Sequence, residues 1–301
     1  MGEDRCSSPP VKSIHKNWKT MIIGIDIGST ATKAVSIGEG RVVHRIKTRA
    51  SDALSSAAGA FGKMLVENDI KMAEIRRIMI TGAGASKIKN ELFGIPTGMT
   101  DEIRCIGIGG MFLAGRDNII ITNIGTGTVI IDAQKDRISH MGGSGVGGGT
   151  ILGLAKKLLS VSDFNGIMEL AAQGSLKTVD LLMEDIMETD LSFLKGHASA
   201  SNFGKMLDSA RNEDIALGLL NMVYQVIGTL SVFAARSRNT DRIIVTGKGG
   251  GNPIGKQVLE EITGLYQVHF EYPQDAEYTT AIGAALSWEH ANSRAGQETY
   301  V

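Results

Sequence analysis

The sequence of 301 residues lacks the features that mark several classes of protein. It has two cysteines, Cys6 and Cys105, which lie so far apart that we expect no structural disulfide and a reducing, cytoplasmic location. The formal net charge is −1, which gives no reason to expect a nucleic acid or an anionic membrane as a partner. No run of about 18 apolar residues is present, and a transmembrane helix is therefore not expected.

Proline is also scarce, with five residues, and no proline-rich or serine-rich linker divides the chain. Two prolines, Pro9 and Pro10, fall within residues 1–20, a polar stretch without the apolar core of a signal peptide. We predict that this stretch is a flexible leader. The remaining length suits one large domain or two joined lobes, which we place at residues 21–115 and 116–301.

Glycine, by contrast, is abundant, with 38 residues. Most of the glycine clusters follow apolar runs that are typical of strands. They lie at residues 24–28, 82–84, 107–110, 125–127, 142–149 and 247–251. Glycine allows tight turns and close approach of the backbone to a ligand. The clusters therefore predict a ligand that is held by several strand-to-turn loops.

The hydrophobic periodicity predicts an α/β chain in which one pattern occurs twice. Strands are expected at residues 21–28, 34–37, 41–48 and 75–81, and again at 118–123, 127–133, 137–141 and 243–246. Helices are expected at residues 51–67, 86–93, 101–113, 150–159, 162–173, 212–236, 253–263 and 276–291. The repeated strand–turn–strand unit predicts a duplicated fold of two lobes that close on a cleft. The helix at 212–236 is apolar on more than one face, which suits either a core or a dimer interface.

The segment DIGSTATK, which begins at Asp26, lies between two predicted strands. Gly28 lets backbone amides approach an anion, and Ser29, Thr30 and Lys33 can donate to phosphate oxygens. A carboxylate at the end of a buried strand is costly unless it is paired or hydrated, so a hydrated Mg²⁺ is the expected partner of Asp26. A plain hairpin with an Asx-type turn is the alternative, but such a turn does not require so many polar groups.

The segment NIGTGT forms a second hairpin turn at the matching point of the repeat. Its Thr126, Gly127 and Thr128 are expected to contact the other side of the same phosphates. Alone this turn is weak evidence, since glycine and threonine are common in turns. Its pairing with the turn at Asp26 makes the prediction of a phosphate site stronger.

Two further glycine clusters precede predicted helices. The first is a loop that ends near the start of a helix, where exposed amides and the helix dipole favour an anion. Its residues expected at the nucleotide are Gly147, Gly148, Gly149 and Thr150. The alternative is a loop without a ligand. The second cluster, with Gly247 and Gly249, lies where adenosine packs in two-lobed ATPases.

These motifs occur in an order that resembles the type II pantothenate kinases of the actin/Hsp70/sugar-kinase superfold. They are DIGST-x-TK, DE-I, NIGTGT, GG-x-G-x-GGGT-x-x-GL, SNFGK at 201–205 and AEYTTAIGAAL at 276–286. The resemblance covers residues 21–288. It implies a duplicated, ribonuclease H-like fold with a nucleotide cleft between two lobes, ATP and Mg²⁺ as cofactors, and a homodimer. It also implies phosphorylation of the primary hydroxyl of pantothenate, the first step of coenzyme A biosynthesis, with feedback by coenzyme A or acyl-CoA.

The same resemblance assigns roles to single residues. Glu102 falls at the catalytic glutamate of the family, where a carboxylate orients the substrate hydroxyl and accepts its proton. The alternative role of Glu102 is to complement a helix dipole. Phe164 stands where an aromatic ring can lie near the nucleotide base. Cys105 is expected to be a small buried hydrophobic residue.

The chain departs from the family at two positions in the substrate pocket, which we expect to include Glu102 and Thr128. Val129 stands in place of a serine, and His140 in place of an arginine. Arg137 is a poor substitute, because a shift of three residues on a strand reverses the face. Hydrogen bonds to charged groups are worth about 1.5–3 kcal/mol each, so the substrate assignment is weaker than the ATP assignment. His140 is either a substrate ligand, a pH-sensitive group or a structural strand residue.

Three other functions are compatible with parts of the sequence. An activator ATPase of 2-hydroxyacyl-CoA dehydratases has a similar first motif, but it needs two cysteines per chain for a shared [4Fe–4S] cluster, and Cys6 and Cys105 do not fit that pattern. A kinase of the same fold could use a different small hydroxyl compound. The third is a nucleotide-binding regulator without catalytic activity. The presence of Asp26, Lys33 and Glu102, which are expected to act in catalysis, argues against it.

Overall fold

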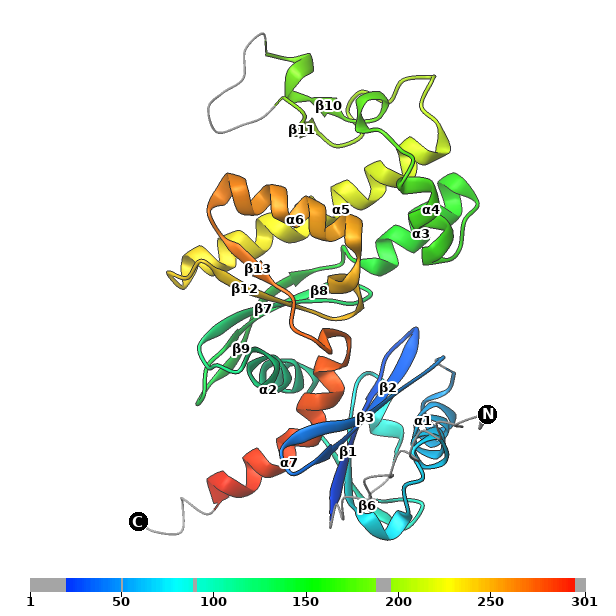
Figure 1. Ribbon diagram of the computed structural model, residues 1–301, viewed down its shortest axis with the longest axis vertical. Helices are drawn as coiled ribbons and strands as arrows, with labels where there is room; N and C mark the ends of the chain where they lie inside the picture. Colours follow the sequence, from blue (N-terminus) through cyan, green and yellow to red (C-terminus); the bar gives the residue numbers. More distant parts are fainter. Residues whose placement is uncertain (1–19, 50, 89–90, 188–195, 296–301) are drawn as a thin grey trace, which may run out of the picture.

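The computed structural model describes residues 20–49, 51–88, 91–187 and 196–295, and it forms an α/β fold with two large sheets (Figure 1). The predicted leader lies outside the described residues except for residue 20.

The N-terminal sheet consists of an antiparallel meander of three strands, two further strands added in parallel, and an antiparallel edge strand. In spatial order its strands are β3 (Arg41–Arg49), β2 (Ala31–Gly38), β1 (Met21–Ile27), β4 (Ile75–Thr81), β6 (Ile95–Met99) and β5 (Glu91–Leu92). Helix α1 (Ala53–Glu67) covers one face, and the Asp52 side chain caps it by accepting from the Ser55 N–H at 3.0 Å.

The C-terminal sheet repeats the same connections. In spatial order its strands are β9 (Ile138–Ser144), β8 (Thr128–Ala133), β7 (Ile119–Ile124), β12 (Arg242–Thr246) and β13 (His269–Glu271). The first three form an antiparallel meander, and β12 adds to β7 in parallel, as β4 adds to β1. The predicted duplication is therefore present in the topology. Helices α5 (Asn212–Ser237) and α6 (Pro253–Tyr266) pack on the outer face, and α3 (Gly148–Leu159) and α4 (Phe164–Ala171) pack against α5.

Helices α2 (Glu102–Ala114) and α7 (Thr279–Ala295) cross between the two sheets (Figure 1). Their backbones touch: a Cβ atom at Gly283 would lie 1.8 Å from the Cys105 carbonyl oxygen, and one at Gly109 would lie 2.0 Å from that of Thr279. Glycine is needed at this crossing because any side chain would force the helices apart. The division at residue 115 stays a prediction, and α7 packs on the N-terminal sheet although it falls in the second range.

The structure corrects several predicted elements. The helix predicted at 86–93 is absent from the described residues of this range, where a 3-10 turn covers Ala85–Lys87 and β5 begins at Glu91. The apolar spacing that suggested a helix arises because Ile88 and Leu92 are both buried in the core beneath α1. Strand β6 was not predicted, since its sequence IPTGM contains proline and glycine, which are depleted in strands. The glycines at 107–110 lie inside α2 and serve packing rather than a loop.

Helix α5 is the one described helix that is long and apolar enough to cross a membrane. However, 61% of its most apolar window is buried inside the protein, where α5 packs against α3, α4 and α6. This burial accounts for its apolar composition. The structure thus gives α5 the core role that the sequence left open.

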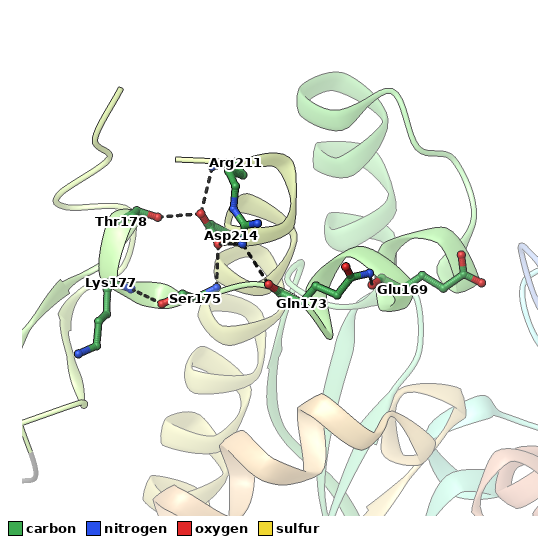
Figure 2. A network of polar contacts seen from close by, with 7 residues as sticks. All are labelled: Glu169, Gln173, Ser175, Lys177, Thr178, Arg211 and Asp214. Atoms are coloured by element: carbon green, nitrogen blue, oxygen red, sulfur yellow. Dashed lines mark hydrogen bonds and ion pairs between the residues drawn. The ribbon is translucent and has the colours of Figure 1, made fainter. Parts of the chain in front are cut away.

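A small two-stranded sheet, β10 (Leu181–Leu182) and β11 (Ser199–Ser201), is attached near the start of α5. Two buried carboxylates fasten this region to α5. Asp180 accepts from the Ser199 hydroxyl at 2.6 Å and the Asn221 amide at 2.8 Å. Asp214 accepts hydrogen bonds from three residues, as Figure 2 shows: Ser175 N–H at 2.8 Å, Thr178 hydroxyl at 3.0 Å and Arg211 N–H at 3.1 Å.

The network around Asp214 predicts a pH-dependent contribution to stability. Burial alone would raise the pKa of Asp214, but the donors from Arg211, Ser175 and Thr178 outweigh burial and lower the pKa to about 2. The unfolded value is about 3.9, so this stabilisation is present above pH 4 and is lost as the pH falls from about 4 to about 2. Asp214→Asn should reduce the free energy of unfolding by about 1.5–3 kcal/mol at pH 7.

Urea unfolding at several pH values tests this expectation. The difference between wild type and Asp214→Asn should shrink toward pH 2, while the exposed control Asp208→Asn should show no such trend. A difference that is the same at pH 2.5 and pH 7 would contradict the role given to the carboxylate.

Candidate active site

The first turns of the two sheets meet, as the repeated motif predicts. The turn that joins β1 to β2 carries Ser29, and the turn that joins β7 to β8 carries Thr126. Their hydroxyl oxygens, Ser29 Oγ and Thr126 Oγ1, lie 3.0 Å apart although the residues are 97 positions apart in sequence. Gly28, Ser29 and Thr30 are accessible to solvent in the same turn. The two predicted phosphate turns therefore face each other across the junction of the sheets.

Beside this junction, three side chains form a row across adjacent strands. Asp26 on β1 pairs in register with Lys33 on β2 and with Thr81 on β4, so the three side chains point to one face of the sheet. Asp26 is buried, with 8% of its surface exposed. Burial raises the pKa of Asp26 to about 6; the Lys33 ammonium opposes this shift, and the Glu102 carboxylate adds to it.

Glu102 is the first residue of α2 and is accessible to solvent. The preceding residue, Asp101, caps the helix by accepting from the Arg104 N–H at 2.9 Å, which leaves Glu102 free of the capping role. Partial desolvation, together with the Asp101 carboxylate, raises the pKa of Glu102, and the Lys33 ammonium lowers it. Asp26, Lys33 and Glu102 thus form one electrostatic group, as a site for phosphoryl transfer requires.

The glycine-rich loop before α3 has a different structure from the one that the sequence predicted. The helix begins at Gly148 rather than at Thr150, and the first glycines belong to β9. The amides expected to bind an anion are already used, because Gly148 N–H donates to the Gly125 carbonyl at 2.9 Å and Gly149 N–H to the Thr126 carbonyl at 2.8 Å. These bonds join the loop to the second phosphate turn.

Close approach explains Gly143 and Gly147 in this loop, whereas Gly142 and Gly145 have open space around them. A Cβ atom at Gly147 would lie 2.7 Å from the Thr126 carbonyl oxygen. The Gly147 N–H donates to the Thr150 hydroxyl at 3.2 Å, and that hydroxyl donates to the Gly145 carbonyl at 3.1 Å. Contacts of Gly147, Gly148, Gly149 and Thr150 with a nucleotide remain predictions.

The fourth glycine cluster lies against the same turn. Gly247 has a φ of 79°, and a Cβ atom there would lie 2.5 Å from the Ile124 carbonyl oxygen. The Gly249 carbonyl accepts from the Tyr224 hydroxyl at 2.7 Å. Phe164, at the start of α4, lies next to Gly148, and the Lys248 ammonium is 5.3 Å from the centre of its ring. An aromatic ring thus adjoins the glycine turns, and a contact of Phe164 with a nucleotide base stays a prediction.

The residues predicted to bind substrate on the C-terminal sheet differ from one another in their contacts and exposure. The Thr128 hydroxyl is engaged, since it donates to the Val146 carbonyl at 2.8 Å. Val129 packs with the apolar cluster beneath α2. His140 pairs with Ile131 of that cluster, so it lies on the same face, where it is exposed. Arg137 is bonded to Asp132 at 3.0 Å, on the opposite face, and it does not replace the missing arginine.

A cavity of about 500 Å³ lies beside Glu102. Its wall is formed by residues 81–83, 85–86 and 99–102, which come from the turn after β4, the 3-10 turn, the end of β6 and the start of α2. Of the residues that form this wall, the sequence indicated only Glu102 as a site residue. The glycine cluster at 82–84 was the signal that could have indicated it, but its partner strand β6 was not recognised.

A divalent cation fits the residues that are present. The described part of the chain contains no cluster of three or more histidine, cysteine, aspartate or glutamate side chains that could hold a metal by itself. Mg²⁺ needs no such cluster, because it usually keeps several waters and binds one or two carboxylates together with substrate phosphates. Asp26 meets this requirement, since a nearby cation would stabilise the ionised form that burial disfavours.

This electrostatic cost predicts that Asp26→Asn stabilises the protein when nucleotide and metal are absent. The folded pKa of Asp26, about 6, is above the unfolded value of about 3.9, so wild-type stability falls as the pH rises from 4 to 6. At pH 8 the variant should unfold with a free energy about 2–3 kcal/mol higher than that of wild type. The difference should vanish near pH 4.

Urea unfolding in EDTA at pH 4 and pH 8 measures this effect, with Asp117→Asn, an exposed aspartate, as the control. An Asp26→Asn variant that is no more stable than wild type at pH 8 would show that the carboxylate is not strained by burial.

Comparison with known proteins identifies the family of this chain. A family model described as Fumble matches residues 118–285, more than half of the chain. A type II pantothenate kinase from Bacillus thuringiensis subsp. konkukian is 30% identical over 282 residues, which are 90% of this chain and 98% of the relative. One from Bacillus cereus is 32% identical over 274 residues, 88% of this chain and 96% of the relative.

Solved structures support the fold. Component A of the (R)-2-hydroxyglutaryl-CoA dehydratase of Acidaminococcus fermentans gives a TM-score of 0.66 at 20% identity, covering 91% of this chain and 99% of that one. A ROK family glucokinase from Streptomyces griseus, in complex with glucose and AMPPNP, gives 0.55 at 14%, covering 88% and 98%. At these identities the likeness shows the fold alone, and it confirms the predicted two-lobed, actin-like class. The family model and the relatives together show that the chain belongs to the Fumble family, that of the type II pantothenate kinases.

Proposed function

We propose that this protein is an ATP-dependent pantothenate kinase, which transfers the γ-phosphoryl group of ATP to the primary hydroxyl of pantothenate. Membership of the family is the observation that carries the proposal. The meeting of the Ser29 and Thr126 turns beside Asp26, Lys33 and Glu102 supports it, because phosphoryl transfer needs phosphate-binding turns, a cation and a carboxylate at one place.

In this proposal Glu102 orients the acceptor hydroxyl and accepts its proton while the oxygen bonds to the γ-phosphorus, and ADP leaves. A carboxylate with a raised pKa is better suited to accept a proton than an ordinary one. Lys33 offsets negative charge near the transferred group. Asp26 would hold Mg²⁺ through water, and the ion would supply charge neutralisation on the phosphates when bound.

The alternative of a cluster-bearing activator has no support from the described cysteine. Cys105 is fully buried, as predicted, and burial raises the pKa of its thiol to about 12, which disfavours the thiolate that an iron–sulfur cluster requires. Cys6 lies outside the described residues. The dehydratase component resembles this chain in fold only.

The family resemblance also leads us to propose a homodimer in the cytoplasm that acts at the start of coenzyme A synthesis and responds to coenzyme A or acyl-CoA. For the dimer, α5 offers limited surface, because most of its apolar window is buried; Phe233, with 58% of its surface exposed, is the main exception.

Replacing Glu102 tests the proposed reaction. Glu102→Gln keeps the shape of the side chain but cannot accept the proton, so kcat should fall by about 10²–10⁴-fold. In the wild-type pH profile of kcat/KM, the contribution of Glu102 should lie above the ordinary glutamate value of about 4.3, because its pKa is raised, and in the variant only the acidic limb from Asp26, near pH 6, should remain.

The assay is ADP release with Mg·ATP and pantothenate. Glu67→Gln, at the exposed end of α1, is the matched control and should behave like wild type. Turnover that is unchanged in Glu102→Gln would remove the role of this residue, and a wild type that binds ATP without using pantothenate would overturn the substrate.

A further inference from the structure

Two ion pairs join the edge of the N-terminal sheet to the segment that leads into α7. On β3, Arg45 pairs with Asp275, 230 positions away in sequence. Lys47, two residues further along the strand, pairs with Glu277 across the same separation. Residues two apart on a strand share a face, so both cations point the same way. We call these four residues the ionic junction.

The 3-10 turn that carries Glu277 also holds one of the glycine turns. It spans Ala276–Tyr278 and directly follows Asp275. Its Ala276 carbonyl accepts the Gly247 N–H at 2.9 Å, and Gly247 belongs to the cluster that we expect to pack against adenosine. One short turn is therefore bonded to the N-terminal sheet through side chains and to the loop after β12 through its backbone.

We propose that the ionic junction positions ATP, because it holds the Gly247 turn at a fixed distance from the predicted phosphate turn of the N-terminal sheet. Its four members are positioning residues, which act on the nucleotide through the Gly247 turn. The proposal rests on the nucleotide-binding part of the proposed function, and it gives a role to residues that had none there.

Strand register places the junction beside the predicted phosphate site. Lys47 pairs with Lys33, and Lys33 pairs with Asp26, so these side chains lie on one face of the sheet in adjacent strands. Two lysines directly opposite each other repel, and the Glu277 carboxylate offsets this repulsion at Lys47. Lys33 is thereby left to act on the carboxylates of the site. Arg49 lies on the same face but is exposed to solvent.

The paired charges are only partly open to solvent. The four side chains have between 19% and 37% of their surface exposed, and partly buried pairs are screened less than fully exposed ones. The phenol of Tyr278 lies among them. Burial, followed by the Glu277 carboxylate, raises the pKa of Tyr278, and Lys47 opposes this shift. The junction thus consists of two cations and two carboxylates around a neutral ring.

The backbone at Asp275 is adapted to the junction. Its φ of 65° lies in the left-handed region, which aspartate and asparagine adopt more readily than most residues. The Asp275 carbonyl accepts the Tyr278 N–H at 2.7 Å, which fixes the turn. Asp275→Asn therefore removes the charge and keeps a residue that suits this conformation.

Direct binding of Mg·AMPPNP in the absence of pantothenate tests the proposal. Asp275→Asn/Glu277→Gln loses both ion pairs, and its Kd should rise at least about threefold. The sign of the change is decisive, because removing two negative charges near a phosphate site would by itself tighten the binding of a polyanion. A Kd that falls, or that changes by less than about twofold, would overturn the proposal.

A double-mutant cycle shows whether Lys47 acts through Glu277 or directly on the phosphates. If the contact is what matters, Lys47→Met/Glu277→Gln should bind within about twofold of the weaker single variant. Factors that multiply would mean that the two residues act independently, which contradicts a positioning role. The control Glu67→Gln breaks the pair of Lys63 and Glu67 within α1, where the two charged groups are 3.5 Å apart, and should keep the wild-type Kd.

Turnover of the same variants separates positioning from a general loss of structure. In Asp275→Asn/Glu277→Gln the KM for ATP should rise by about the factor seen in the Kd. Its kcat at saturating ATP and its KM for pantothenate should stay within about twofold of wild type. A lowered kcat with an unchanged KM for ATP would show damage to the fold and would overturn the proposal.

The outcomes also separate the junction from the proposed function. Wild-type turnover of pantothenate with an unchanged Kd in the variant would overturn the junction and leave the kinase function intact. Weakened nucleotide binding in the variant, without wild-type turnover of pantothenate, would support the junction and overturn the acceptor. A wild type that binds no nucleotide would overturn both.

Discussion

The backbone contact between α2 and α7 is the constraint on which the rest of the structure depends. Both helices lie between the two sheets, and they approach so closely that Gly109 and Gly283 have no room for a side chain. This contact holds α2 in place, and Glu102 is the first residue of α2 after the Asp101 cap. The position of the proposed catalytic carboxylate is therefore set by the packing of its own helix against α7, which is far from it in sequence. A flexible loop could not hold the group as firmly.

The glycine turns of the C-terminal sheet form a second rigid unit. Hydrogen bonds from Gly148 and Gly149 join the loop before α3 to the turn at Thr126, and Gly247 packs on the adjacent Ile124 backbone. Three turns from different parts of the chain thus support one another. This arrangement preorganises the surface that we expect to bind ATP. The amides of Gly148 and Gly149, which the sequence suggested would be free to bind an anion, are used in these hydrogen bonds.

Asp26 illustrates the tension between stability and function in this site. Its burial disfavours the charged form, yet its register with Lys33 and Thr81 places it beside the junction of the two sheets. Asp214 is the opposite case, because its four hydrogen bonds stabilise the charge and serve only to fasten the chain before α5. The same side chain type is therefore strained where a ligand is expected and satisfied where the role is structural.

The sequence by itself determined the α/β class, the duplication and the positions of the two turns that we expect to bind phosphate, because these depend on local patterns: alternation, apolar runs, and glycine and hydroxyl residues between two strands. It also indicated the catalytic role of Glu102, but through the order of the family's motifs and not through a physical argument. It did not determine β6, whose proline and glycine hide its pairing with β4, and it wrongly predicted a helix at 86–93, where burial of Ile88 and Leu92 imitated a helical pattern. Only the tertiary structure decided that Thr81 joins the row of Asp26 and Lys33, that the amides of Gly148 and Gly149 are already bonded, and that a cavity adjoins Glu102. Each of these depends on strand register or on contact between distant segments, and a local pattern does not encode which distant backbone will lie beside it.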